Sequence, residues 1–531
     1  MTLNRRALLG AAGAVAAAPL AAPRLARASG AATLTFVPQA DLAILDPVWT
    51  TATVTRNHAF LVFDTLFGQD HAFQPVPQMA EGASADAGGK DWTIKLRPGL
   101  MFHDKTPVLA RDCVVSVQRW GKRDAFGQAL MAATDEISAP DDKTIRFRMK
   151  KPFALLPAAL SKFTAFVPAI MPERLARTDA FTQVQEMVGS GPYRFVASER
   201  SAGNQVVYEK FAGYKPRPNG TPSWTAGPKV AHFDRVVWKI IPDSATAAAA
   251  LQSGEIDWWE TPPNDYLALL RKNSFVVLKL IDPTGSIAIM RFNQLFPPFD
   301  NPAIRRVMLE AVNQADYMTA VAGTDHAMWK TDVGVFTPGT PLAAAVPPGL
   351  FSDKQDYARI KKDLAAAGYK GEKVVMLSTS DLPVLTAESQ VGADSFRKMG
   401  LNLDEQVMDW GSVVSRRAKK DPPDKGGWNV FFTGWSGTDM MNPAGHLSLR
   451  GNGAGAWFGW PTAPKIEALR DAWFDAPDLA AQKRICGEMQ KQVFIDVPYI
   501  PLGQYFTLQA YRKSLQDVLT GLPIFWNVRR A

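Results

Sequence analysis

The stretch NVFFTGWSGTDMMNP, residues 429–443, joins an aromatic ring and a carboxylate in a pattern that suits ligand binding. Apolar residues lead into Gly434 and Trp435, and a short polar loop with Thr438 and Asp439 follows. A carboxylate at the end of a buried strand can accept an ammonium group, because an unpaired buried charge is very costly. Trp435 can offer a flat apolar wall and a cation–π face. The alternative is that Asp439 caps the turn before the following Asn-Pro pair.

The sequence carries no motif that indicates enzymatic chemistry. No Gly-x-Ser-x-Gly elbow, His-Glu-x-x-His or Ser-x-x-Lys set stands in a supporting context. GNGAGA, residues 451–456, matches the dinucleotide fingerprint, but WFGWPTAP follows where a helix is required. The six histidines are scattered without metal-ligand spacing. We therefore predict a protein that is not an enzyme, with no catalytic residue, no metal site and no cofactor.

The N-terminus has the layout of an export signal. LNRRALLGAAGAVAAAPLAAPRLARASG begins with paired arginines, continues with an Ala-rich apolar run and ends in small residues at Ala26 and Ala28. The pair resembles a twin-arginine signal, although Asn4 stands where Ser or Thr is usual. We expect residues 1–28 to be a signal peptide cleaved near Ala28, and the mature protein to be periplasmic.

Length and charge limit the function classes further. The chain has 531 residues, too many for one core, so two or three domains are expected. The net charge of +8 includes four arginines and no acid within residues 1–28, which leaves +4 on the mature chain. Lys and Arg form no long run, so nucleic acid is a poor candidate partner. Cys113 and Cys486 lie among helically spaced apolar residues and are expected to be buried thiols rather than a disulfide.

Strands alternate with helices along the chain, which favours α/β domains. Residues 91–120 suggest a strand, a Pro-Gly turn and a helix, and residues 189–214 suggest two antiparallel strands. The clearest helix is expected over 300–321, where Asn301 can cap the first turn. Further helices are predicted over 356–371, 464–474 and 480–494.

Four blocks in order resemble the family 5 extracellular solute-binding proteins of ABC importers, the peptide- and nickel-binding group. WTIKLRPGLMFHDKTPVLARDCVVSVQR is the most specific of them. VGSGPYRF, SATAAAALQSGEIDWWE and FNQLFPPFDNPAIRRVMLEAVNQADYM are the other three. Together the resemblance covers nearly the whole mature chain.

The resemblance implies a type II periplasmic-binding-protein fold, with two lobes joined by a hinge and a small extra domain on lobe one. Mapped by the blocks, lobe one would hold residues 31–75, 189–283 and 503–531. The extra domain would hold 76–188, and lobe two 284–502. The implied function is a monomeric receptor that binds a peptide or peptide-like solute between the lobes and delivers it to the membrane permease. Opines, oligosaccharides, glutathione and metal complexes stay open as solutes, and a secreted hydrolase is a more distant alternative.

The resemblance also bears on the ligand contacts. In peptide-binding relatives, a Gly-Trp pair and a nearby Asp lie in the cleft, and the acid receives the ligand's α-ammonium group. Gly434, Trp435 and Asp439 match this pattern, with the acid one residue further along than in the dipeptide type. Dipeptide binders also hold the ligand's carboxylate with an arginine, but residues 376–396 here contain none. Asp381 in that stretch suits a ligand with a second cationic group, or is an exposed loop acid.

Weaker candidates come from the tryptophans and from one threonine loop. Trp258 or Trp259 could line the pocket, but neighbouring strand residues point to opposite faces, so both cannot. Trp457, in the segment AGAWFGWP, could form an aromatic wall or lie in the core of lobe two. Thr51 and its neighbours lie where relatives contact the ligand, although loop threonines are usually solvated.

Overall fold

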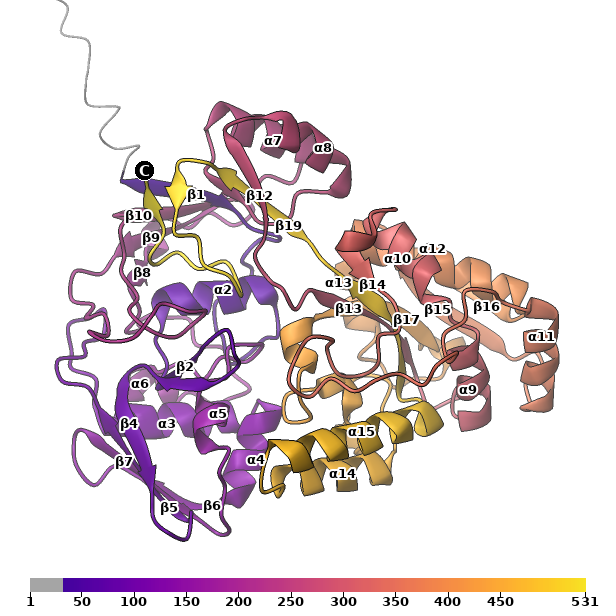
Figure 1. The fold of residues 1–531 in the computed structure, drawn as a ribbon, viewed down its shortest axis with the longest axis horizontal. Coiled ribbons are helices and arrows are strands. Elements are labelled where there is room, and N and C mark those ends of the chain that lie inside the picture. Colours follow the sequence, from indigo (N-terminus) through magenta and orange to yellow (C-terminus); the bar gives the residue numbers. More distant parts are fainter. Residues whose placement is uncertain (1–31) are drawn as a thin grey trace, which may run out of the picture.

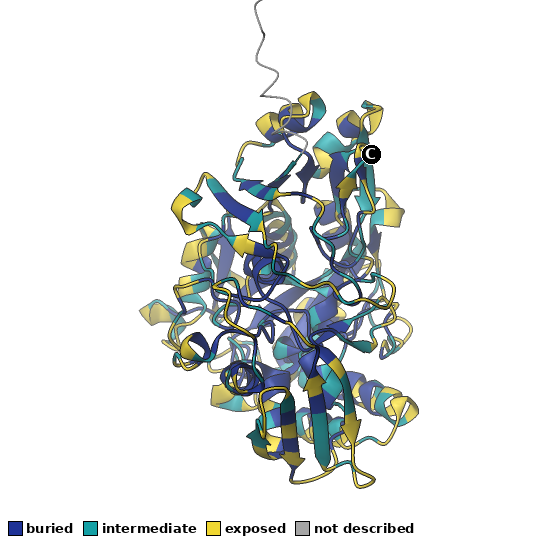
Figure 2. Ribbon diagram, turned by 90° about the vertical axis from the view of Figure 1, so that its left-hand side faces the viewer, coloured by how far each residue is buried: buried dark blue, intermediate teal, exposed yellow. Residues whose placement is uncertain are grey.

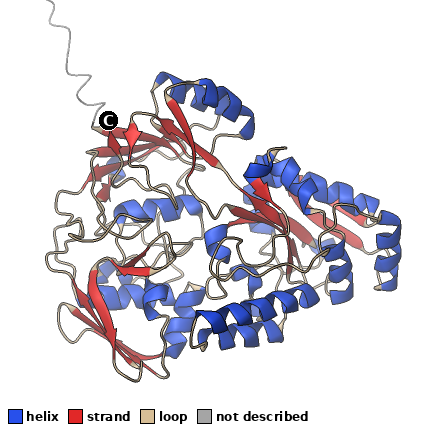
Figure 3. Cartoon of the chain, in the orientation of Figure 1, coloured by secondary structure: helices blue, strands red, loops and turns tan. Residues whose placement is uncertain are grey.

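The computed structural model describes residues 32–531, so the predicted signal peptide lies outside the described residues. Two separate sheets with helices around them make up most of the molecule, and a smaller sheet lies to one side (Figures 1 and 3). The α/β architecture predicted from the alternating pattern is confirmed. Among residues 32–531, no helix is both long and apolar enough to cross a membrane.

The first sheet has seven strands and belongs to the region predicted as lobe one. In spatial order they are β12 (Val276–Leu280), β19 (Leu508–Arg512), β11 (Trp258–Trp259), β1 (Thr33–Val37), β10 (Arg235–Lys239), β9 (Gln205–Lys210) and β8 (Tyr193–Phe195). Helices α7 (Ser244–Ser253) and α8 (Asn264–Lys272) contribute to the core on one face. The core on the other face includes residues of α2 (Thr53–Val62) and the C-terminal segment 522–528. This sheet is therefore covered on both sides.

The second sheet has six strands and belongs to the region predicted as lobe two. Their order is β14 (Trp329–Lys330), β18 (Tyr499–Tyr505), β13 (Ser286–Phe292), β17 (Val430–Ser436), β15 (Lys373–Thr379) and β16 (Asn402–Met408). The helices of this region are α9 (Pro302–Glu310), α10 (Gln314–Ala322), α11 (Tyr357–Ala366), α12 (Pro383–Lys398), α13 (Trp410–Arg416), α14 (Pro464–Phe474) and α15 (Leu479–Asp496). The single helix expected over 300–321 is two helices, because the Asn313 side chain accepts from Ala315 N and starts α10 anew.

The third sheet belongs to the predicted extra domain and is antiparallel. Its order is β4 (Ala80–Ala85), β5 (Asp91–Leu96), β7 (Thr144–Met149) and β6 (Thr134–Ser138). Helices α3 (Ala110–Gly121), α4 (Ala125–Ala133), α5 (Leu156–Leu160) and α6 (Glu173–Ala176) complete the domain. Short strand pairs also join β2 (Phe67–Gln69) to β3 (Pro75–Pro77) and β20 (Leu515–Gln516) to β21 (Arg529–Arg530). Figure 2 shows exposed residues along the outer face of this domain and buried residues toward its junction with the rest.

The chain passes between the two large sheets at residues 281–285 and again at 506–507. Strand β18 continues to Tyr505 in the second sheet, two residues beyond the boundary predicted at 503. At the first crossing Gly285 has φ +60°, and a Cβ there would lie 2.5 Å from Tyr505 O. Glycine is thus required where the two crossing segments touch. Cys113 and Cys486 are both free and buried, so the expected thiols are confirmed.

Candidate functional site

Asp439 lies in a short 3-10 turn, Gly437–Met440, directly after β17. Gly437 N donates to Gly285 O at 2.7 Å, which ties this turn to the first crossing segment. A Cβ on Gly437 would lie 2.2 Å from Thr284 O, so only glycine permits this approach. The position of the Asp439 carboxylate is therefore fixed relative to the connection between the lobes.

The Asp439 carboxylate faces the extra domain and lacks a cationic partner. Ala165 N, from the extra domain, donates to Asp439 Oδ1 at 3.3 Å. Within residues 32–531, no basic side chain lies within ion-pair distance of this half-buried carboxylate. The alternative role as a turn cap belongs to Asn442 instead, whose Oδ1 accepts from Ala444 N and Gly445 N. Asp439 thus carries a charge that neighbouring side chains leave unpaired.

A line of polar side chains from lobe one ends near Asp439. Glu260 accepts from Asn57 Nδ2 at 2.9 Å, and Asn57 Oδ1 accepts from the buried Arg56 guanidinium at 3.1 Å. Asp282, at the first crossing, accepts twice from Thr284 through the same oxygen. Burial raises the pKa of Asp282, and the nearby charge of Asp439 raises it further, while Arg56 opposes this shift. Acids from both lobes and one arginine therefore share this junction.

Trp435 and Trp457 form an aromatic wall beside the turn. Their ring centroids are 5.2 Å apart with an interplanar angle of 67°. Both side chains are only partly buried, yet the Trp435 Nε1 atom is shielded and has no hydrogen-bond partner in residues 32–531. Gly434 leaves room for the Tyr505 hydroxyl, which would lie 3.2 Å from a Cβ at position 434. The wall thus holds a buried N–H donor that no described residue pairs.

Arg417 is a cation that the sequence analysis missed. Its guanidinium carbon lies 5.0–5.6 Å from the ring centroids of Phe458, Trp410, Trp457 and Phe431. Burial lowers its pKa to about 10, and its Nε has no hydrogen-bond partner in the described chain. Residues 32–531 also provide no carboxylate within ion-pair distance of it. Cation–π contacts hold the group in place, and its hydrogen-bond donors are left for an anion.

Asp381 binds groups of its own chain segment and of the start of α13. Its Oδ1 accepts from Thr379 Oγ1 at 2.7 Å and from Trp410 N at 2.8 Å, just before α13. The residue is exposed. Asp381 therefore orients the start of α13, the helix that leads to Arg417, and leaves its second oxygen for other contacts.

The remaining predicted site residues lie in different surroundings. Trp258 is fully buried in the core of lobe one, and its Nε1 donates to Gln509 Oε1 at 2.8 Å. Trp259 is also buried, on the opposite face of the sheet. The Thr438 hydroxyl is buried and pairs with Ser436 Oγ at 2.8 Å. Thr51 is exposed in the loop before α2. The structure thus brings together Gly434, Trp435, Asp439 and Trp457, and leaves Trp258 in a closed core.

Two surface depressions lie elsewhere on lobe two. One, of about 460 Å³, is lined by residues around Pro347 and Lys354, and the other, of about 410 Å³, surrounds Pro298 and Asn301. Neither includes a predicted site residue. We favour the junction at Asp439 because unpaired charges and donors converge there, whereas the depressions are shallow parts of the outer surface.

The arrangement defines a class of protein before any comparison is made. Two covered α/β sheets, two crossing segments and a third small sheet form the type II periplasmic-binding-protein fold. The family model for bacterial extracellular solute-binding proteins, family 5 middle, matches residues 74–457. A probable peptide ABC transporter periplasmic-binding protein, y4tO, from Sinorhizobium fredii is 36% identical over 537 residues and covers 100% of both chains. The chain belongs to the family 5 bacterial extracellular solute-binding proteins.

Other relatives extend the likeness. The glutathione-binding protein GsiB of Pectobacterium atrosepticum is 26% identical and covers 97% of this chain and 96% of its own. Agropinic-acid-bound AgaA from A. tumefaciens R10 shares the fold with a TM-score of 0.78 at 21% identity, over 94% of this chain and 99% of its own. DppA of Helicobacter pylori with the peptide STSA has a TM-score of 0.77 at 21% identity, over 94% and 98%. The family consists of periplasmic receptors for ABC importers rather than enzymes, so periplasmic receptor function follows for this chain.

Proposed function

We propose that this receptor binds a peptide or peptide-like zwitterion at the junction of its lobes and delivers it to the permease of an ABC importer. The observation that carries the proposal is a pair of unmatched charges beside one aromatic wall. Asp439 has no cationic partner and Arg417 has no anionic partner among the described residues. Trp457 contacts both the Arg417 guanidinium and the Trp435 ring.

A solute that carries both an ammonium and a carboxylate group would pair with Asp439 and with Arg417. The ammonium group would bind Asp439, with Asp282 close enough to add to the negative potential. The carboxylate would accept hydrogen bonds from the free donors of Arg417. Such charge-assisted hydrogen bonds are stronger than those between neutral groups. The arginine missing from residues 376–396 thus has a substitute in space, and peptide relatives of the family support this solute class.

Export, closure and assembly complete the proposal. Residues 1–28 serve as the export signal, and the mature protein acts as a monomer. The lobes close about the segments 281–285 and 506–507, and the closed form presents the solute to the permease. Closure removes water from the junction, which strengthens both charge contacts.

The direct test identifies the natural solute. Mature protein is purified gently from its own periplasm and denatured, and the released small molecules are identified by mass spectrometry. We expect one dominant species, at about one molecule per protein in accordance with a single interlobe site, with a free amine and an acid group. A neutral sugar would remove both the peptide assignment and the role of Asp439.

A variant pair then tests the residue assignment with that solute. Asp439→Asn should weaken binding measured by calorimetry by about 1.5–3 kcal/mol, the contribution of a hydrogen bond to a charged group. Asp421→Asn, in an exposed loop of lobe two, is the matched control and should leave the affinity unchanged. Equal affinity of the Asp439 variant and the wild type would exclude Asp439 from the site.

A further inference from the structure

The C-terminal end of α14, in lobe two, reaches across to the extra domain. Figure 1 shows α14 and α15 running along the lower side of the molecule toward α4, away from the two crossing segments. Phe474 lies 5.9 Å from Phe126 and 6.2 Å from Phe153, measured between ring centroids. At the surface beside them, Lys151 Nζ pairs with Asp475 Oδ1 at 2.5 Å. Lobe two and the extra domain therefore touch at a second place besides Ala165 and Asp439.

Arg470 bridges the two bodies from within this contact. Its guanidinium donates to Pro443 O at 2.9 Å and Ala444 O at 3.1 Å, both in lobe two. One further and longer bond, 3.3 Å, goes to Ala125 O at the start of α4. The two bonds within lobe two keep the side chain oriented whether or not the extra domain is in place. Of the three Arg470 bonds, only the one to Ala125 must break for the bodies to separate.

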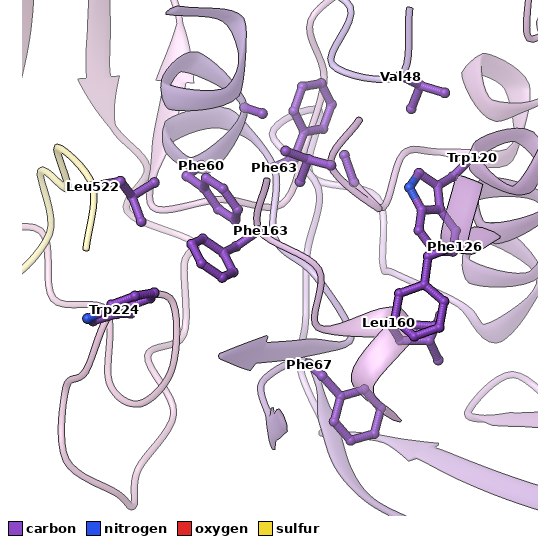
Figure 4. Packing of buried hydrophobic residues seen from close by; sticks show 14 of the residues in the cluster. Val48, Phe60, Phe63, Phe67, Trp120, Phe126, Leu160, Phe163, Trp224 and Leu522 are labelled. Atoms are coloured by element: carbon purple, nitrogen blue, oxygen red, sulfur yellow. The ribbon is translucent and has the colours of Figure 1, made fainter. Parts of the chain in front are cut away.

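The two sides of the contact differ in how firmly they are built. Phe126 and Phe153 are buried, and Figure 4 shows Phe126 beside Leu160 within the extra domain. Phe474 is only half-buried and sits at the very end of α14. Two buried rings of the extra domain thus receive the half-buried Phe474 ring, and a surface ion pair and one hydrogen bond lie beside it. A contact of this size can favour the closed form and can still break when the lobes open.

We propose that the end of α14 is a latch, formed by Arg470, Phe474 and Asp475, that holds the closed form on the extra domain without help from the solute. The proposal rests on the hinge closure described above, but not on the identity of the solute. The latch acts far from the crossing segments, where a small rotation produces a large displacement. It lowers the free energy that solute binding must supply to close the receptor.

The latch is tested on the full, solute-free mature protein by distances between two spin labels. Gln128→Cys on α4 and Lys483→Cys on α15 place labels on exposed positions of the two bodies, and the native thiols are buried and stay unlabelled. Phe474→Ala should raise the ratio of the long-distance to the short-distance population about tenfold, the factor that about 1.4 kcal/mol of lost apolar burial produces. Phe494→Ala, a half-buried ring that packs on Phe351 within lobe two, is the control and should leave the ratio unchanged.

A charge swap covers the case in which Phe474→Ala fails to fold. Lys151→Glu places like charges at the surface pair and should raise the long-distance population, and adding Asp475→Lys should restore it. An unchanged distance distribution in Phe474→Ala and in Lys151→Glu would overturn the latch, because α14 would then move with the extra domain as one body. Since no solute is present in this measurement, loss of the solute assignment would not alter its outcome.

Discussion

Glu388 provides a prediction whose size follows from the structure. The residue lies on α12 with 0% of its surface exposed, and neither carboxyl oxygen has a hydrogen-bond partner within residues 32–531. Burial raises the pKa of this carboxyl well above its usual value of 4.5. Tyr317 and Tyr505 are its neighbours, since the charge of Glu388 would raise the pKa of either hydroxyl beyond the effect of burial. The folded protein therefore holds this proton more strongly than the unfolded chain does.

The sign of the pH effect follows from linkage. Below pH 4.5 the carboxyl is protonated in both states, so its contribution to folding is fully present. Above that pH the unfolded chain releases the proton while the folded protein retains it, and stability falls as pH rises toward the raised pKa. The loss is at most about 1.4 kcal/mol per pH unit, the limit for one proton, and so at most about 2.7 kcal/mol between pH 5.5 and pH 7.5. Glu388→Gln keeps the size of the side chain and removes this dependence.

The assay compares the two proteins by guanidinium unfolding at pH 5.5, 6.5 and 7.5, followed by tryptophan fluorescence and circular dichroism. The free energy of unfolding of Glu388→Gln relative to the wild type should rise over this range, by at most about 2.7 kcal/mol. Glu310→Gln, which removes an exposed carboxylate of lobe two, should show no such trend. A relative free energy that stays within about 0.5 kcal/mol, the usual scatter of neutral substitutions, would refute a protonated, unpartnered Glu388.

Three further predictions concern the site and the thiols. Arg417→Met should weaken binding of a zwitterionic solute, measured by calorimetry, by about 1.5–3 kcal/mol and leave the melting temperature nearly unchanged, since the aromatic cage can enclose a methionine. Gly437→Ala should lower stability in a thermal-shift assay by about 1–3 kcal/mol, because its Cβ would overlap Thr284 O. Burial raises the pKa of Cys486 to about 12 and that of Cys113 still higher, so both thiols should react with a thiol reagent at pH 8 only after unfolding.

The sequence was informative where function depends on a continuous stretch. The order of elements in the conserved-looking blocks predicted the two-sheet fold, and the Gly434–Asp439 segment predicted an acid and an indole at the end of β17. Turn residues at 437–440 carry enough local information to place the acid after the strand. Ala165, which donates to that acid, and Asp282, whose pKa its charge raises, lie far away along the chain and could not be read from it.

Two features of the site region could not be read from the sequence, and they have a common physical cause. Trp258 or Trp259 is a predicted pocket residue, and both are buried in cores on the two faces of their sheet. A strand covered on both faces gives the same apolar run as one beside a cleft. Arg417 lies in the basic segment SRRAKK, which carries no local sign of a binding role. The environment of the Arg417 side chain depends on Trp457, which lies forty residues later in the chain and packs over the guanidinium. Burial and pairing are properties of contacts between distant segments, and local patterns do not encode them.

The placement of the two unmatched charges argues for a dipolar solute rather than for a cation or an anion alone. Asp439 and Arg417 do not pair with each other, and the Trp435–Trp457 pair lies against the Arg417 guanidinium. A simple cation would satisfy Asp439 and leave the Arg417 donors unpaired, and a simple anion would do the reverse. Under the proposed assignment, a solute with both charges and an apolar body would satisfy the acid, the arginine and the wall at once, and the distance between its charges would decide which solutes bind.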